Sequence, residues 1–152
     1  MTIYASQFLK KEHISFLDES SMESALHKLI NCLVVAGALI NPSEFYNAII
    51  EREEISSTGI GLGIALPHAK MEEIKDFFIA IGVHTGAGIG WGSIDNVKVK
   101  LICLIGGPKN MHKEYLSILS QLTRSIKDVK RRQQIVLSRE KDAIINLFKI
   151  DY

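Results

Sequence analysis

The 152-residue sequence has few of the features that mark a secreted or membrane-spanning protein. It contains only two cysteines, Cys32 and Cys103, and each lies beside apolar residues, which predicts reduced core thiols rather than a disulfide framework. No apolar run approaches the ~20 residues that a membrane-spanning helix needs. The N-terminus also lacks a basic segment followed by an apolar one, so no secretory signal is expected. These absences predict a cytoplasmic protein without membrane insertion.

An excess of charge of one sign is also missing. The chain has 18 lysines and arginines against 17 aspartates and glutamates, which gives a net charge of +1 and no argument for a nucleic-acid partner. Its histidines and cysteines show no H-x-x-x-H or C-x-x-C spacing, so we expect neither a metal site nor a cofactor. Because no repeat, low-complexity tract or linker is present, the sequence predicts a single domain over residues 1–152.

Capping signals and hydrophobic periodicity predict two helices in the first third of the chain. Residues 13–17 are typical of a short strand. A capping box at residues 20–23 then begins a helix, which Gly37 ends by supplying a left-handed turn. Asn41 and Pro42 begin a second helix, which we expect to end near Arg52. Arg52 should therefore stand close to the polar loop that follows.

The rest of the chain predicts strands followed by helices. Residues 64–67 are expected to be extended, and residues 77–83 and 97–105 are β-rich runs, the second ended by Gly106-Gly107-Pro108. A long helix over 110–126 should present one apolar side, and shorter helices should follow Asp128 and span 139–149. This order favours an α/β or α+β protein with helices covering a mixed sheet. The expected apolar side of the long helix consists of Leu116, Leu119, Leu122 and Ile126.

The most informative segment runs from Arg52 to Lys70 and reads REEISSTGIGLGIALPHAK. Its glycines do not form G-x-G-x-x-G, and no G-K-[ST] is present, so by themselves they predict tight turns rather than a nucleotide loop. The residues that flank the glycines suit an anion: Arg52, Ser57 and Thr58 on one side and His68 on the other.

These residue types are the ones that a phosphate-carrying histidine requires. One ring nitrogen must be neutral and exposed, and the other should donate a hydrogen bond that fixes the tautomer. The transferred group then needs positioning and donors around its oxygens. Amides approach closely at glycines, hydroxyls add donors, and a guanidinium gives a planar pair of donors. The pattern therefore favours His68 as a functional residue over an ordinary surface or core histidine.

Residues 52–70 resemble the active-site signature of the fructose/mannitol-type enzyme IIA domains of the bacterial phosphoenolpyruvate-dependent phosphotransferase system, the PTS EIIA type-2 family. The family pattern, R-E followed by S-T-G-I-G-x-G-I-A-I-P-H, is matched at nearly every position, with Leu66 in place of an isoleucine. Residues 20–36 and 116–148 also follow the family's helical pattern, and the stand-alone nitrogen-regulatory IIA is the most similar relative by eye. The resemblance implies a three-layer α/β/α sandwich with a small mixed β-sheet.

The resemblance also implies a function as a phosphotransferase component. His68 would accept a phosphoryl group from an HPr-like phosphocarrier protein, Arg52 would clamp the phosphate, and Ser57 and Thr58 would support it. The group would then pass to a IIB domain of a sugar permease, or the phosphorylated state would regulate a target protein. Because no IIB or IIC segment is fused to this chain, we expect the regulatory role over fructose- or mannitol-type transport.

The chain departs from the family at its second histidine, which usually begins the long C-terminal helix. Tyr115 occupies that position here, and His112 lies three residues earlier on the same helix face. His112 reaches the phosphate, or the Tyr115 hydroxyl donates in its place, or the phosphohistidine is less well neutralised. We expect His112 in the site with Tyr115 beside it.

Two further hypotheses remain open from the sequence. His84 follows an apolar strand and is a candidate to line the site, which would also permit a metal-dependent hydrolase built on His68, His84 and His112. The glycine-rich segment 86–91 either forms a docking surface or buries Trp91 in the core.

Overall fold

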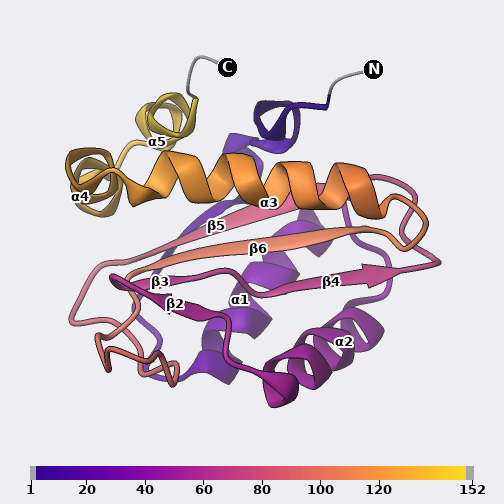
Figure 1. Cartoon of the computed structure of the whole chain (residues 1–152), viewed down its shortest axis with the longest axis horizontal. Coiled ribbons are helices and arrows are strands. Elements are labelled where there is room, and N and C mark those ends of the chain that lie inside the picture. Colours follow the sequence, from indigo (N-terminus) through magenta and orange to yellow (C-terminus); the bar gives the residue numbers. More distant parts are fainter. Residues whose placement is uncertain (1–2, 150–152) are drawn as a thin grey trace.

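The computed structural model of the chain describes residues 3–149 and places a mixed β-sheet between two layers of helices (Figure 1). Helices α1 (Met22–Val35) and α2 (Pro42–Ile55) cover one face of the sheet. Helices α3 (His112–Lys127), α4 (Val129–Leu137) and α5 (Lys141–Phe148) lie on the other face, beside the short 3-10 helices η1 (Ala5–Phe8) and η2 (Lys11–His13). This arrangement confirms the three-layer α/β/α fold that the sequence predicts.

The sheet has the strand order β1-β5-β6-β3-β2, with β4 also paired to β6. Strand β5 runs parallel to β1 and antiparallel to β6, while β3 and β4 both run parallel to β6. Strands β3 and β4 therefore form one interrupted strand along the same side of β6, and β2 pairs with its β3 part. The strand bounds are β1 Ile14–Leu17, β2 Gly59–Gly61, β3 Ile64–Ala65, β4 His68–Met71, β5 Phe78–His84 and β6 Leu101–Pro108.

The predicted helix starts and ends agree closely with the structure. The predicted capping box, Ser20 with Glu23, is wrong by one residue: Ser21 caps α1 by accepting a hydrogen bond from the Ser24 amide. Gly37 adopts φ +80° directly after α1, as expected. Helix α2 begins at Pro42 and continues one turn beyond Arg52. Within residues 3–149, no helix combines the length and apolar character required to cross a bilayer.

Side chains of this interrupted strand alternate between the two faces of the sheet. Ile64 and Leu66 belong to the apolar cluster under α3, whereas Ala65 and Ala69 belong to the cluster under α1 and α2. His68 and Lys70 continue the first of these two series. The strand period therefore directs both residues toward the N-terminal end of α3.

The predicted apolar side of α3 is wrong by one position at its start. Leu116 is 51% exposed, whereas Tyr115 and Ile118 are buried against the sheet together with Leu122 and Ile126. Leu119 is only partly buried. The helix thus turns Tyr115, rather than Leu116, toward β4.

The second predicted strand is displaced toward the C-terminus. Residues 97–100 lie outside β6, and among them only Val99 forms a bridge, with Ile89. At its other end, β6 continues through Gly106 and Gly107 to Pro108. The rings of Phe78 and Phe77 lie where a Cβ at Gly106 and Gly107 would stand. These glycines therefore admit two aromatic rings rather than end the strand. Strands β2 and β4 were not predicted.

The two thiols differ in their surroundings. Cys103 is fully buried in β6, and burial raises its pKa to about 12, as expected for an inert core thiol. Cys32 is only half-buried, and its Sγ donates to the Glu12 carbonyl oxygen at 3.0 Å. Both thiols are free, and the predicted core position is correct for Cys103 but wrong for Cys32.

Candidate functional site

The site begins at the break between β3 and β4. The chain leaves β3 after Ala65, passes through Leu66 and Pro67, and resumes pairing with β6 at His68. Within this break the Leu66 amide donates to the Thr58 carbonyl oxygen, and the Pro67 carbonyl accepts from the Ile105 amide. These bonds fix the backbone before His68, and the pairing of β4 with β6 fixes it from His68 onward. The side chain of His68 is half-buried.

The backbone also sets the tautomer of His68. Nδ1 of His68 lies 2.6 Å from the carbonyl oxygen of Leu66. Because a carbonyl oxygen only accepts, Nδ1 carries the proton and Nε2 keeps its lone pair. This tautomer leaves the Nε2 lone pair free, so that Nε2 could act as a nucleophile.

Several groups act on the pKa of His68, and together they lower it. Burial is the largest cause, and it is opposed by the hydrogen bond to Leu66, which favours the protonated ring. The charges of Arg52 and Lys70 lower the pKa further, while Glu53 acts in the opposite direction. A lowered pKa keeps the imidazole neutral at neutral pH, which is the state that nucleophilic attack requires.

Arg52 comes to His68 from the C-terminal end of α2. Its Nη1 donates to the Ser56 carbonyl oxygen at 2.9 Å, which holds the guanidinium beside the following loop. Its positive charge lowers the pKa of both His68 and Tyr115. Because a guanidinium has five N–H donors, most of them stay available to a bound anion.

Thr58 is held by a carboxylate that the sequence analysis did not single out. Glu53 accepts hydrogen bonds from the Thr58 amide at 3.1 Å and from the Thr58 hydroxyl. The Trp91 indole N–H lies 3.3 Å from both the Glu53 carboxylate and the Thr58 hydroxyl oxygen. Trp91 is only 6% exposed, so of the two interpretations of segment 86–91, burial of Trp91 is correct.

Ser57 is likewise engaged within its own loop. Its hydroxyl donates to the Trp91 carbonyl oxygen at 3.0 Å and accepts from the Gly59 amide at 3.1 Å. The hydroxyl protons of Ser57 and Thr58 therefore both serve protein acceptors. In this arrangement the two residues shape the loop beside Arg52 instead of presenting free donors.

Tyr115 and His112 occupy different places at the start of α3. The Tyr115 ring lies 5.7 Å from the His68 ring, centroid to centroid, and its buried hydroxyl has no hydrogen-bond partner among the described residues. Burial raises the Tyr115 pKa, so the hydroxyl keeps its proton and remains a donor. His112 is exposed, and its Nδ1 lies 2.5 Å from Lys70 Nζ. Tyr115 thus faces His68, while His112 contacts Lys70.

His84 is engaged far along the sheet from His68. His84 is the last residue of β5. Ile105 of β6 pairs with His68 on one side and with Ile79 of β5 on the other, so His68 lies level with Ile79 and not with His84. Its Nε2 donates to the Glu19 carbonyl, and its Nδ1 accepts from the Gly86 and Gly88 amides. The structure therefore does not bring His84 into the site. Within residues 3–149, no three potential metal ligands of the His, Cys, Asp and Glu types gather.

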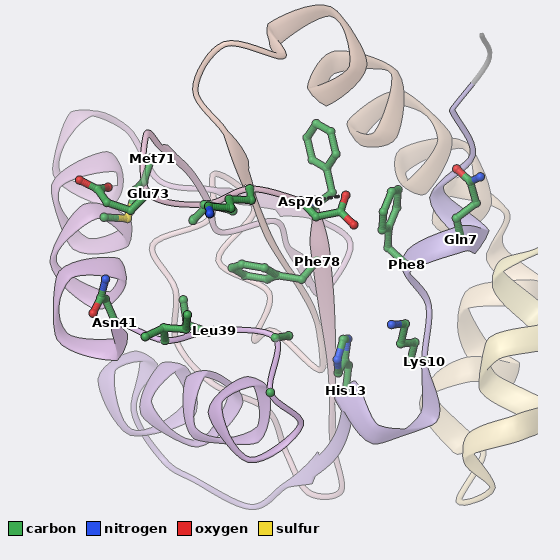
Figure 2. Close-up of a pocket in the computed structure, with 16 residues that line it drawn as sticks. Gln7, Phe8, Lys10, His13, Leu39, Asn41, Met71, Glu73, Asp76 and Phe78 are labelled. Carbon is green, nitrogen blue, oxygen red and sulfur yellow. Dashed lines mark hydrogen bonds between the residues drawn. The ribbon is translucent and has the colours of Figure 1, made fainter.

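A cavity of about 460 Å³ lies away from these residues, between the 3-10 helices, the α1–α2 connection and the segment from Met71 to Phe78 (Figure 2). Lys10, His13, Asp76 and Phe78 are among the residues that line it (Figure 2). None of the six predicted site residues lines it. This cavity is therefore separate from the candidate site around His68.

The sequence analysis missed three residues that organise the site. Glu53 and Lys70 stand inside the signature segment, and their signal was their place just after Arg52 and His68, respectively. Trp91 had no signal beyond being the single tryptophan in a glycine-rich segment. Its contact with Glu53 depends on the fold.

Comparison with known families gives one match over nearly the whole described chain. Residues 7–150 match the family described as "Phosphoenolpyruvate-dependent sugar phosphotransferase system, EIIA 2". The chain is 30% identical to the "PTS system fructose-specific EIIABC component" of Bacillus subtilis (strain 168) over 93% of its own length, but spans only 22% of that protein.

Relatives of similar length carry two different descriptions. The "Nitrogen regulatory protein" of Escherichia coli (strain K12) is 29% identical over 84% of this chain and 78% of its own length. The "PTS system fructose-specific EIIA component" of Haloferax volcanii is 29% identical over 82% of this chain and 80% of its own length.

Solved structures agree with the fold. The crystal structure of nitrogen regulatory protein IIA-Ntr from Neisseria meningitidis superposes with a TM-score of 0.88 at 21% identity, covering 95% of this chain and 98% of that one. IIA mannitol from Escherichia coli gives a TM-score of 0.77 at 22% identity, covering 93% and 99%.

Proposed function

Since this chain belongs to the EIIA type-2 family of the phosphoenolpyruvate-dependent sugar phosphotransferase system, we propose that it is a phosphohistidine carrier of regulatory, nitrogen-type function. In this proposal His68 accepts a phosphoryl group from an HPr-like phosphocarrier protein, and the phosphorylation state of His68 sets the affinity for a target protein. The proposal assigns the protein to the cytoplasm.

The proposed transfer is a displacement between two histidine rings. The Nε2 lone pair of His68 forms a new N–P bond while the N–P bond of the donor breaks and its electron pair returns to the donor ring. The proton on Nδ1 stays in place, and the Leu66 carbonyl, 2.6 Å away, stabilises the positive charge that the ring gains. No other proton has to move in this step.

The surrounding groups divide into phosphate contacts and supports. Arg52 supplies the charge that neutralises the phosphoryl oxygens, because its guanidinium already acts on the His68 ring and has unused donors. The Tyr115 hydroxyl donates to the same group, since it is buried, protonated and unpartnered. Ser57 and Thr58 keep the loop in position through Trp91 and Glu53.

The observation that carries the proposal is the hydrogen bond from His68 Nδ1 to Leu66, which leaves Nε2 as a neutral nucleophile next to a cation. Its test is incubation with phosphoenolpyruvate and purified general and nitrogen-branch carrier proteins, followed by intact-mass measurement. The proposal expects a mass gain of one phosphoryl group in the wild type and none in His68→Ala. Equal labelling of both proteins would refute it.

A second candidate function is transfer to a separate sugar permease, which the similarity to the fructose-specific component of Haloferax volcanii favours. The two functions differ in what the phosphorylated protein does next. Addition of purified fructose- and mannitol-type IIB domains to the phosphorylated protein separates them. Rapid loss of phosphate from His68 to a IIB domain supports transport, whereas retention of phosphate supports the regulatory role.

A further inference from the structure

Lys70 stands on the same side of the sheet edge as His68. The two residues are separated by one residue in β4, so the strand period points their side chains to the same face. Ala69 between them faces the cluster under α1 and α2. The strand partner of Lys70 is Gly107, and the ring of Phe77 lies where a Cβ at Gly107 would stand. Lys70 is therefore directed toward the start of α3, where Tyr115 meets His68.

Two residues of α3 hold the Lys70 ammonium in this place. Nζ donates to Nδ1 of His112 at 2.5 Å and lies 5.3 Å from the centroid of the Tyr115 ring. The same Tyr115 ring lies 5.7 Å from the His68 ring. The ammonium is thus packed against the ring that itself packs against the nucleophile.

Lys70 also lacks a carboxylate partner. Over residues 3–149, the one ion pair within 4 Å joins Lys28 and Glu19, at 3.7 Å. The positive charge of Lys70 is therefore not cancelled by a neighbouring acid, and it adds to that of Arg52 in lowering the His68 pKa, behind the larger effect of burial. The positive potential of these two cations disfavours a proton on the His68 ring. The same potential favours the doubly charged form of a phosphoryl group bonded to that ring.

We propose that Lys70 is a second phosphate-contacting cation of the His68 site, and that His112 is a positioning residue which orients Lys70 rather than a phosphate ligand. This inference rests on the proposed function and names the group that neutralises the phosphoryl oxygens where the family's second histidine is replaced by Tyr115. Since Nδ1 of His112 accepts from Lys70, that nitrogen is not available to donate to phosphate.

The test uses chemical phosphorylation, so that it does not depend on a carrier protein. Potassium phosphoramidate transfers its phosphoryl group to a histidine nitrogen, with ammonia as the leaving group. The pKa of the bound phosphoryl group is then measured by phosphorus NMR in the wild type, in Lys70→Met and in Lys70→Arg. Lys113→Met is the matched control, because it removes an exposed lysine charge from the residue after His112.

The proposal expects the pKa of the phosphoryl group to rise by about one unit or more in Lys70→Met, since an adjacent cation favours the dianion. Lys70→Arg, which keeps the charge, and Lys113→Met should titrate close to the wild type. A Lys70→Met protein that titrates like the wild type, with unchanged circular dichroism, overturns the proposal.

The role of His112 is tested by a double-mutant cycle. His112→Ala should raise the phosphoryl pKa less than Lys70→Met does, and should add little in the Lys70→Met background. An undiminished effect of His112→Ala in that background means that His112 contacts phosphate directly, which overturns its positioning role.

Failure of this inference is distinguishable from failure of the proposed function. If neither phosphoramidate nor any carrier modifies His68, the proposed function fails. The placement of Lys70 is still measured in the unmodified protein, where Lys70→Met should raise the imidazole pKa of His68 as followed by proton–nitrogen NMR.

Discussion

Nδ1 of His68 lies 2.6 Å from the carbonyl oxygen of Leu66, two residues earlier in the chain. Many histidines are oriented by a carboxylate, but here the orienting acceptor is a backbone atom exposed by the break between β3 and β4. The ring orientation is therefore tied to the sheet edge itself. A substitution at Leu66 that preserves the backbone should leave the tautomer unchanged.

Loss of the Arg52 guanidinium should slow phosphoryl transfer. Arg52→Ala removes the cation that acts on both His68 and Tyr115, and the initial rate of labelling by a phosphorylated carrier should fall by about one to several powers of ten. Arg124→Ala is the control, because Arg124 is an exposed arginine at the far end of α3. Equal rates for Arg52→Ala and Arg124→Ala would contradict the role of Arg52.

Removal of the Tyr115 hydroxyl should have opposite effects on two quantities: the protein should become more stable, and it should accept a phosphoryl group more slowly. Tyr115→Phe deletes a buried hydroxyl that has no partner, so the free energy of unfolding should rise by about 1 kcal/mol. Phosphoryl acceptance should become slower by about tenfold, because one donor to the phosphate is lost. Urea unfolding and the initial labelling rate measure the two effects.

Tyr46→Phe is the comparison for Tyr115→Phe, since Tyr46 of α2 stacks on His27 of α1, away from the site. It should change neither quantity noticeably. The account is wrong about Tyr115 if the phenylalanine variant is labelled as fast as the wild type.

The Glu53 carboxylate should support the loop that carries Thr58. Glu53→Gln replaces an acceptor of bonds from Thr58 and Trp91 by an amide, and we expect a loss of about 1–3 kcal/mol in the free energy of unfolding. Because Trp91 is the single tryptophan, its fluorescence should shift as the indole environment changes. Glu54→Gln, at the exposed neighbouring position, should show neither effect.

Buried His13 should make the protein less stable in mild acid. Its Nδ1 donates to the Ile79 carbonyl, but burial dominates and lowers its pKa below the ordinary value of 6.5. Below that pH the unfolded chain binds a proton that the folded protein does not, so the free energy of unfolding falls as the pH decreases through and below about 6.5.

Urea unfolding between pH 7.5 and pH 5 measures this dependence on pH. His68 contributes in the same direction, because its pKa is also lowered by burial. His13→Gln should therefore reduce the slope without abolishing it. A wild-type stability that does not change over this range would contradict the assignment.

The sequence predicted those parts of the molecule that depend on local chemistry. Pro42 at a helix start and Gly37 after a helix end both act through their immediate neighbours in the chain. Gly106 and Gly107 show the limit of such rules, because glycine that usually ends a strand here makes room for the rings of Phe77 and Phe78.

The rest of the site depends on packing between distant segments. Lys70 meets His112 only because Tyr115, rather than Leu116, turns toward the sheet and so fixes the rotation of α3. Glu53 meets Trp91 across a separation of 38 residues. Neither contact can be predicted from the local sequence, because each depends on which face of a helix packs against the apolar core.

The most direct test of the account is the identity of the phosphorylated atom. The protein, labelled with nitrogen-15 in its histidines, is phosphorylated by its carrier and examined by nitrogen and phosphorus NMR. The account predicts a single N–P bond at Nε2 of His68, with the proton of Nδ1 directed to Leu66 in the unphosphorylated ring. A phosphoryl group on Nδ1 of His68, or on any of the other four of the five histidines, would contradict it.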